Sequence, residues 1–193
     1  DPPLIPGSEA LETVLSSMLT PKDMHNRLLT RLLQEIPQRD DPPMKGVRLL
    51  VSGSVMDDAE LLKIVEAAGG SVVADDLSTG SRYFWDLIDS NTNPPLLAIA
   101  KRYLDKVPCP FMGQSEDRFR HVKDMVKGYD VEGVIIFALR FCDPHLFDAP
   151  LLKEELESSG VPVLCLEWEH AVTGVAQLRT RIEAFLEMIR GVG

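Results

Sequence analysis

From residue 46 onward, short aliphatic runs alternate with longer segments whose apolar residues recur at helical spacing. Val47–Val51 is a β-branched and aliphatic run closed by Ser52-Gly53-Ser54, which is the pattern of a buried strand. Residues 57–68 follow as a helix, with Ser54 to Asp57 spaced like a capping box, and residues 71–75 form a second strand. A strand, a helix and a strand within about 30 residues predict a parallel βαβ unit.

The second half of the chain repeats this alternation. The further predicted elements are helices 94–106 and 116–127, strand 133–139, helix 150–158 with Asp148 as its cap, strand 162–167 and helix 175–190. Strands that alternate with helices predict an α/β fold. We expect a flavodoxin-like (Rossmann-like) four-stranded parallel sheet in the order 2-1-3-4, with helices on both faces.

An N-terminal segment of different character precedes this domain. Residues 1–19 contain several prolines and predict little order, whereas Thr20-Pro21 starts a helix whose apolar stripe runs from Met24 to Ile36. Residues 38–45, with two adjacent prolines, have the composition of a linker. We therefore expect an N-terminal helical segment and linker at residues 1–45 and the flavodoxin-like domain at residues 46–193.

Charge and composition narrow the possible functions. Among 193 residues, 20 are basic and 30 are acidic, which gives a net charge of −10, so neither nucleic acid nor an anionic membrane surface is an expected partner. No apolar run reaches the roughly 18 residues of a membrane span. Three cysteines are an odd number, which favours a reducing compartment, and we expect a cytoplasmic protein. The first residue is Asp1, which suggests a processed, trimmed or partial chain.

The predicted strand order places a crevice at the carboxyl ends of strands one and three, where open α/β sheets bind ligands. Ser52, Gly53 and Ser54 leave the first of these strands, and the loop 140–143 leaves the other. We expect Ser52, Gly53 and Ser54 to face a substrate there.

The turn 75–82 after the second strand is rich in hydroxyl, carboxylate and guanidinium groups. Ser78 and Thr79 could face an anionic ligand, and Arg82 could donate charge-assisted hydrogen bonds to it. The alternative, which spacing alone favours, is a hydrogen-bonded turn that caps the next helix. The acidic segment 167–170 leaves the last strand in the same direction, and such segments are more often simply solvated.

The three cysteines predict different environments. Cys142 lies in a polar loop that leaves a strand at the predicted crevice, so it could ligate a metal or act as a nucleophile, or it could be a partly buried structural thiol. Cys165 lies inside a predicted strand and should be in the core. Cys109 lies between two prolines, and this position is equally compatible with a role as a ligand and with no specific role. No Cys-x-x-Cys spacing predicts a self-contained metal site.

Several common catalytic motifs are missing from the sequence. It contains no Gly-x-x-x-x-Gly-Lys-Ser/Thr, no Gly-x-Gly-x-x-Gly after a strand, no Gly-x-Ser-x-Gly and no His-Glu-x-x-His. ATP hydrolysis, NAD binding and serine hydrolysis are therefore disfavoured.

A combination of motifs nevertheless resembles a known family. The segments that carry the resemblance are Asp75–Tyr83, Arg140–Pro144, Phe147–Pro150, Gly160–Glu167 and Gln177–Phe185. Together they resemble the 2-hydroxyglutaryl-CoA dehydratase D-component family, which includes subunits of ATP-dependent benzoyl-CoA reductase. The resemblance covers roughly residues 45 to 190.

The resemblance implies low-potential electron transfer to CoA thioesters in anaerobic metabolism. The implied partners are a homologous dehydratase or reductase subunit, an acyl-CoA substrate and a separate activator that hydrolyses ATP. The implied cofactor is a [4Fe–4S] cluster held between two α/β domains, with Cys142 as a ligand. Family subunits are about twice as long as this chain, so the chain resembles the C-terminal domain of a subunit. On its own it should hold the cluster incompletely or not at all.

Three functional hypotheses follow from the sequence. The first is the C-terminal domain of an iron–sulfur subunit of a 2-hydroxyacyl-CoA dehydratase or a benzoyl-CoA reductase, inactive as a separate chain. The second is a non-catalytic assembly module that pairs with a homologous domain through apolar helix faces. The third, a general flavodoxin-like ligand-binding domain, accounts for the strands but not for the motifs.

Overall fold

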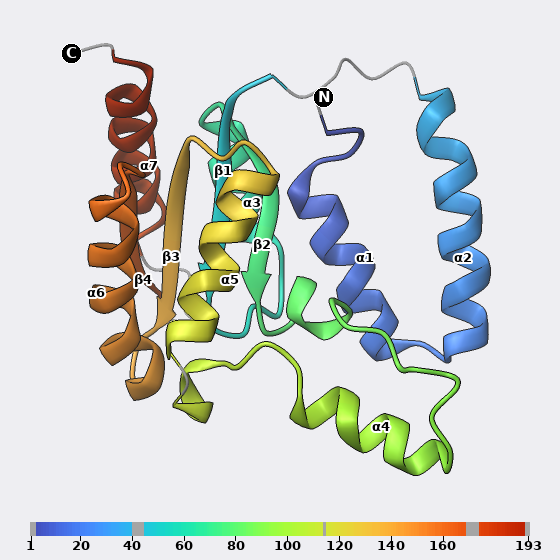
Figure 1. The fold of residues 1–193 in the computed structure, drawn as a ribbon. Coiled ribbons are helices and arrows are strands. Elements are labelled where there is room, and N and C mark those ends of the chain that lie inside the picture. Colours follow the sequence, from blue (N-terminus) through green and yellow to red (C-terminus); the bar gives the residue numbers. More distant parts are fainter. Residues whose placement is uncertain (1–2, 40–44, 114, 169–173, 192–193) are drawn as a thin grey trace.

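Four parallel strands form the centre of the protein in a computed structural model, which describes residues 3–39, 45–113, 115–168 and 174–191. The strands are β1 (Val47–Gly53), β2 (Gly70–Leu77), β3 (Gly133–Leu139) and β4 (Val163–Trp168). Their order is β2-β1-β3-β4, and each pairs in parallel with its neighbours. The predicted α/β fold and its strand order 2-1-3-4 are confirmed (Figure 1).

Helices cover both faces of this sheet. Successive strand residues point to opposite sides, and apolar side chains on both sides pack against helices. Leu49 and Val51 of β1 pack on the side of α3 (Glu60–Ala67) and α7 (Val175–Arg190). Leu50 packs on the opposite side, in a second core with residues of α5 (Ser115–Gly128) and α6 (Asp143–Ser158). Parallel strands buried on both faces explain the nearly continuous aliphatic runs in the sequence.

Two predicted helix starts are wrong. Ser54 does not cap α3, because it is buried and its Oγ accepts a hydrogen bond from Leu139 N at 3.3 Å. Asp58 Oδ1 accepts the Glu60 N–H instead, at 2.9 Å. Helix α6 begins at Asp143 rather than near residue 150, so the proline in its first turn is Pro144, and Pro150 lies inside the helix. The predicted cap Asp148 is therefore also an interior residue of α6.

The N-terminal segment is more ordered than the sequence suggests. Residues 7–19, expected to carry little order, form α1 (Gly7–Leu19), and α2 (Lys22–Glu35) follows, ending in the short helix η1 (Ile36–Gln38). Leu11 is 2% exposed and belongs to the same core as β1 and α3. Ser8 Oγ donates to Glu66 Oε2 of α3 at 2.6 Å. Helix α1 is therefore attached to the α/β core, while the division at residue 45 stays a prediction.

Between β2 and α5 the chain leaves the sheet at the carboxyl ends of the strands. This region contains the short helices η2 (Ser81–Tyr83) and η3 (Pro110–Met112) and the longer helix α4 (Pro95–Leu104), which lies beyond the strand ends in Figure 1. Among the described helices, none combines the length and the apolar character that a membrane crossing requires.

Candidate functional site

The three residues expected to face a substrate after β1 lie inside the domain. Ser52 is 1% exposed, and its Oγ donates to Asp76 Oδ2 at 2.7 Å. Ser54 N donates to Phe137 O at 3.0 Å, which ties the end of β1 to β3. A Cβ at Gly53 would lie 1.8 Å from the same Phe137 oxygen, so only glycine fits this crossing. The hydroxyl groups of Ser52 and Ser54 form hydrogen bonds within the protein, and the role of these residues in contacting a substrate stays a prediction.

The turn after β2 is closed by its own hydrogen bonds. Asp75 Oδ1 accepts the backbone N–H groups of Leu77 at 3.1 Å and Ser81 at 2.7 Å. Burial raises the pKa of Asp75. The turn needs Gly80, since a Cβ there would lie 1.9 Å from Asp75 Oδ1. Residues 75–82 therefore form a hydrogen-bonded turn in which Asp75 accepts the first N–H group of η2, and an additional role in binding an anion stays a prediction.

The expected ligand-facing residues of this turn differ in their surroundings. Thr79 Oγ1 donates to Met56 O at 2.6 Å and accepts Met56 N–H at 3.0 Å, which joins the turn to the loop after β1. Ser78 is half-buried. Arg82, expected to donate to an anion, is only 6% exposed and donates to Gly53 O at 2.8 Å. Any ligand contact of Arg82 would therefore have to be made from inside the fold.

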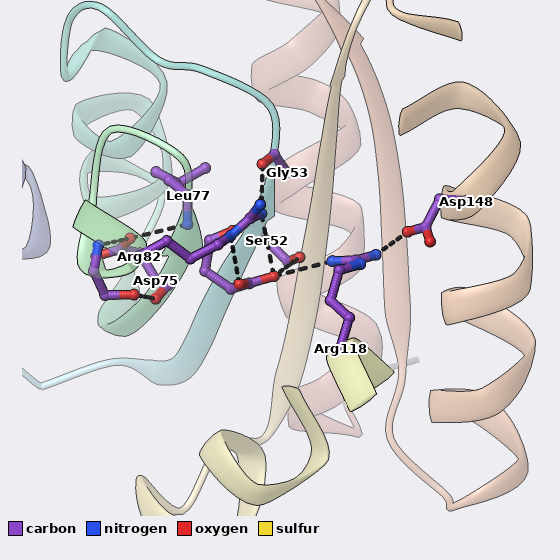
Figure 2. Close-up of polar contacts among 9 residues, drawn as sticks. Ser52, Gly53, Asp75, Leu77, Arg82, Arg118 and Asp148 are labelled. Carbon is purple, nitrogen blue, oxygen red and sulfur yellow. Dashed lines mark hydrogen bonds and ion pairs between the residues drawn. The ribbon is translucent and has the colours of Figure 1, made fainter. Parts of the chain in front are cut away.

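Arg82 belongs to a buried group of four charged side chains, the charge network (Figure 2). Its members are Asp76, Arg82, Arg118 and Asp148. Asp76 is at the centre and fully buried, with Oδ1 at 2.7 Å from Arg82 Nε and Oδ2 at 3.1 Å from Arg118 Nη1. Arg118 also pairs with Asp148 through its Nη2. Two carboxylates and two guanidinium groups cancel in charge, as buried ions must.

The charge network connects five parts of the chain around the carboxyl ends of β1 and β2. Asp76 comes from β2, Arg82 from η2, Arg118 from α5 and Asp148 from α6, while Ser52 of β1 donates to Asp76. Burial lowers the pKa of Arg118 to about 10, and nearby Asp76 opposes that shift, so Arg118 stays charged at neutral pH. The network therefore fixes the relative positions of the segments that surround the predicted crevice.

Three buried atoms of the network have no hydrogen-bond partner among the described residues: Asp76 Oδ1, Arg82 Nη1 and Arg118 Nε. Asp76 Oδ1 is in the ion pair with Arg82 Nε, which leaves the two guanidinium N–H groups without a partner. Because buried guanidinium donors are costly to leave unbonded, these two N–H groups are the polar atoms of the network most available to an added oxygen atom.

Two histidines lie close to the charge network. His145, in the first turn of α6, is 4% exposed, and its ring lies 6.4 Å from that of Phe111. Burial lowers the pKa of His145 to about 4, and the positive charges of Arg82 and Arg118 act in the same direction. Burial also lowers the pKa of His121, whose ring meets Trp85 edge-on at 4.8 Å. Both imidazoles are therefore neutral at pH 7.

Sequence reasoning missed Arg118, Asp148 and the two histidines as site residues. A usable signal existed for Arg118, because it lies four and seven residues before Val122 and Met125 on the buried face of α5. Asp148 similarly lies in line with Leu152 and Leu156. A charged residue on an apolar helix stripe indicates a buried ion pair, since an unpaired buried charge is too costly to retain.

Cys142 lies where β3 passes into α6. It is half-buried and immediately precedes the first residue of α6, with its N–H donating to Leu139 O at 3.0 Å. The preceding Phe141 is 86% exposed and takes a left-handed conformation with φ 69°, which is uncommon for an aromatic residue. The amino end of a helix stabilises negative charge, which suits a thiolate ligand.

The other two cysteines have separate positions. Cys109 is half-buried and immediately precedes η3. Cys165, expected in the core, is also only half-buried: it packs from β4 against the core between the sheet and α6 and lines a cavity there. Burial raises the pKa of Cys165. Among the described residues, no group of three or more Cys, His, Asp or Glu side chains is arranged to hold a metal ion.

A cavity of about 670 Å³ opens between α6 and α7 beside the carboxyl ends of β3 and β4. Its polar lining includes Arg140, Glu167, Gln177 and Arg181, and Arg181 donates to Cys165 O at 2.8 Å. The acidic segment 167–170 begins within β4, whose last two residues are Glu167, which is exposed, and Trp168. Residues 169 and 170 lie outside the described residues, so their expected solvation stays a prediction.

Comparison with known proteins identifies relatives over nearly the whole chain. The model of the family "2-hydroxyglutaryl-CoA dehydratase, D-component" matches residues 1–189, so the similarity extends through the N-terminal helices beyond the expected 45–190. The (R)-phenyllactyl-CoA dehydratase beta subunit of Clostridium sporogenes is 27% identical over 97% of this chain and 50% of its own length. The lactoyl-CoA dehydratase subunit beta of Anaerotignum propionicum is 28% identical over 87% of this chain and 45% of its own.

A benzoyl-CoA reductase subunit from Thauera aromatica is 21% identical over 98% of this chain and 50% of its own length. The chain thus spans about half the length of the curated relatives it matches. The family match and these relatives agree with the motifs in the sequence: the chain belongs to the 2-hydroxyglutaryl-CoA dehydratase D-component family.

Proposed function

We propose that this chain is the C-terminal domain of an iron–sulfur subunit of a 2-hydroxyacyl-CoA dehydratase or a benzoyl-CoA reductase. The reaction would remove water from a 2-hydroxyacyl-CoA or reduce an aromatic acyl-CoA, after an electron delivered by a separate ATP-hydrolysing activator. The observation that carries the proposal is family membership, with named relatives of both kinds. Partner subunits follow from the relatives being subunits themselves.

The proposed cofactor is a [4Fe–4S] cluster, which would supply one electron at low potential. Its fit to this chain is limited to one thiol, because the described residues contain no complete ligand group and one thiolate does not hold such a cluster. Cys142 is the best-placed ligand. It lies at the amino end of a 16-residue helix, on a loop of uncommon backbone conformation, at the end of the sheet where α/β folds bind ligands.

The remaining expected residues would act on the substrate side. Ser52, Gly53, Ser54, Ser78, Thr79 and Arg82 surround the ends of β1 and β2, next to the charge network. In this proposal Arg82 Nη1 and Arg118 Nε, the unpartnered donors, orient an oxygen of the acyl-CoA or an ordered water.

Anaerobic iron and acid-labile sulfide analysis, with an electronic spectrum, tests the cluster. The measurement is made on this chain alone and on the chain joined to the part of the Clostridium sporogenes beta subunit that it does not match. We expect iron only in the joined protein, and loss of that iron in Cys142→Ala. Cys165→Ala is the matched control, because that thiol is also half-buried but packs from β4 against the core between the sheet and α6. Unchanged iron in Cys142→Ala would remove Cys142 from the ligand set.

A further inference from the structure

Helix α4 presents its apolar side to solvent. Leu96, Ile99, Ala100, Tyr103 and Leu104 recur at the i, i+3, i+4, i+7, i+8 spacing that normally faces a core. Their exposures include 75% for Leu96, 55% for Tyr103 and 72% for Leu104. We call these five residues the α4 stripe.

The opposite side of α4 holds the helix to the domain. Ala98 is 4% exposed, and Arg102 donates from Nε to Asp86 O at 3.1 Å and from Nη2 to Tyr83 O. These contacts fix which side of the helix faces outward. The α4 stripe is therefore presented by a helix that is already formed and oriented, which reduces the entropy lost on docking.

Further apolar side chains are exposed on α4 and before it. Leu97, next to the stripe, is 44% exposed, and Leu87 and Ile88, in the segment before α4, are 87% and 50% exposed. Leu87 lines a small hollow with Ala98 and Arg102, on the other side of the helix from the stripe. Single exposed leucines are ordinary, but a contiguous apolar patch on a helix marks a surface where another protein element packs. Helices with anchors at this spacing bind by laying the apolar side into a groove.

We propose that the α4 stripe docks against the half of the full-length subunit that this chain does not contain. The length of the relatives supports this occupant. The alignments with three relatives include 97–98% of this chain but only about 50% of each relative. An equally long portion of polypeptide therefore accompanies this domain in the relatives. The inference rests on that length relation and on the exposure of α4, and it holds whether or not Cys142 binds a cluster.

Thiol labelling in a joined protein tests the docking surface. The part of the Clostridium sporogenes beta subunit that this chain does not match is joined to it through a flexible linker, which gives a millimolar effective concentration. Ile99→Cys reports on the stripe, and Lys127→Cys, at an exposed polar position of α5, is the matched control. Alkylation rates are read peptide by peptide with mass spectrometry, because the chain has three native cysteines.

We expect alkylation at residue 99 to be at least tenfold slower in the joined protein than in the chain alone, and alkylation at residue 127 to be unchanged. Adding Leu104→Lys should restore fast labelling at residue 99. Equal rates at residue 99 in both proteins would overturn the proposal. So would slow labelling in the chain alone with a dimeric mass by light scattering, which would assign the stripe to a second copy. Protection only by an added alpha subunit would assign it to that partner. None of these readouts depends on iron.

Discussion

The charge network and the α4 stripe lie near the same end of the sheet but reverse the usual placement of polar and apolar groups. The network buries four charges, with Asp76 and Arg118 no more than 2% exposed, and matches each charge within this chain. The stripe exposes large apolar side chains on a helix that this chain holds only by its other side. The charges of the network are balanced within the chain, although two of its buried N–H groups have no partner among the described residues, whereas the stripe is incomplete without a partner. The first therefore serves folding of this domain, and the second serves assembly.

Removing the centre of the charge network should have the largest effect. Asp76→Ala leaves two buried guanidinium groups without their shared carboxylate, and breaking a buried ion pair costs about 3–5 kcal/mol of unfolding free energy. Urea denaturation at pH 7 measures the loss. Glu35→Ala, which removes an exposed ion pair with Arg31, is the control and should change stability by less than about 0.5 kcal/mol. A loss below about 1 kcal/mol for Asp76→Ala would show that the network is not needed for folding.

The outer pair of the network should behave as a unit. Arg118→Met leaves the buried Asp148 without its partner, and Asp148→Leu leaves Arg118 without one of its two carboxylate partners. Each single change should therefore lower the free energy of unfolding. The double variant replaces both ions with apolar side chains of similar size and should lose less than the two single losses added together, by about 1–3 kcal/mol. A double-mutant cycle from urea denaturation measures this coupling. Simple additivity would contradict the pairing.

These two predictions concern residues that the sequence identified only in part. The strands could be predicted, because buried parallel strands have a distinctive aliphatic pattern, whereas their order was predicted by analogy with flavodoxin-like folds. Helix α1 was missed because prolines surround its start, although Leu11 and Leu15 recur at helical spacing. The pairs Asp76–Arg118 and Arg118–Asp148 join residues 42 and 30 positions apart, which local patterns do not specify. The partner that covers α4 is likewise not encoded in α4 itself.

Lowering the pH should lower the free energy of unfolding, because His145, next to the charge network, resists protonation in the folded state. Its pKa is lowered from 6.5 to about 4 in the folded state, so between these values the unfolded chain binds more protons. Stability is then lost as pH falls from 6.5 to 4, at up to about 1.4 kcal/mol per pH unit. His121 acts in the same direction and Asp75 in the opposite one, because burial raises the pKa of that carboxyl. His145→Gln should flatten the slope measured by denaturation across this range, and an unchanged slope would show that His145 is not its source.

The smallest effect is expected at the stripe, and it separates the two regions most directly. Leu96→Ala removes a side chain that is 75% exposed, so the isolated chain should change in stability by less than about 0.5 kcal/mol. Leu152→Ala makes the same chemical change at a fully buried position of α6 and should cost about 2–5 kcal/mol. Urea denaturation of both variants gives the comparison. A loss above about 1 kcal/mol for Leu96→Ala would mean that α4 already packs against something in the free chain. A near-zero change would mean that Leu96 contributes nothing to folding of this domain, so the free energy of burying it is available only when another polypeptide segment covers the stripe.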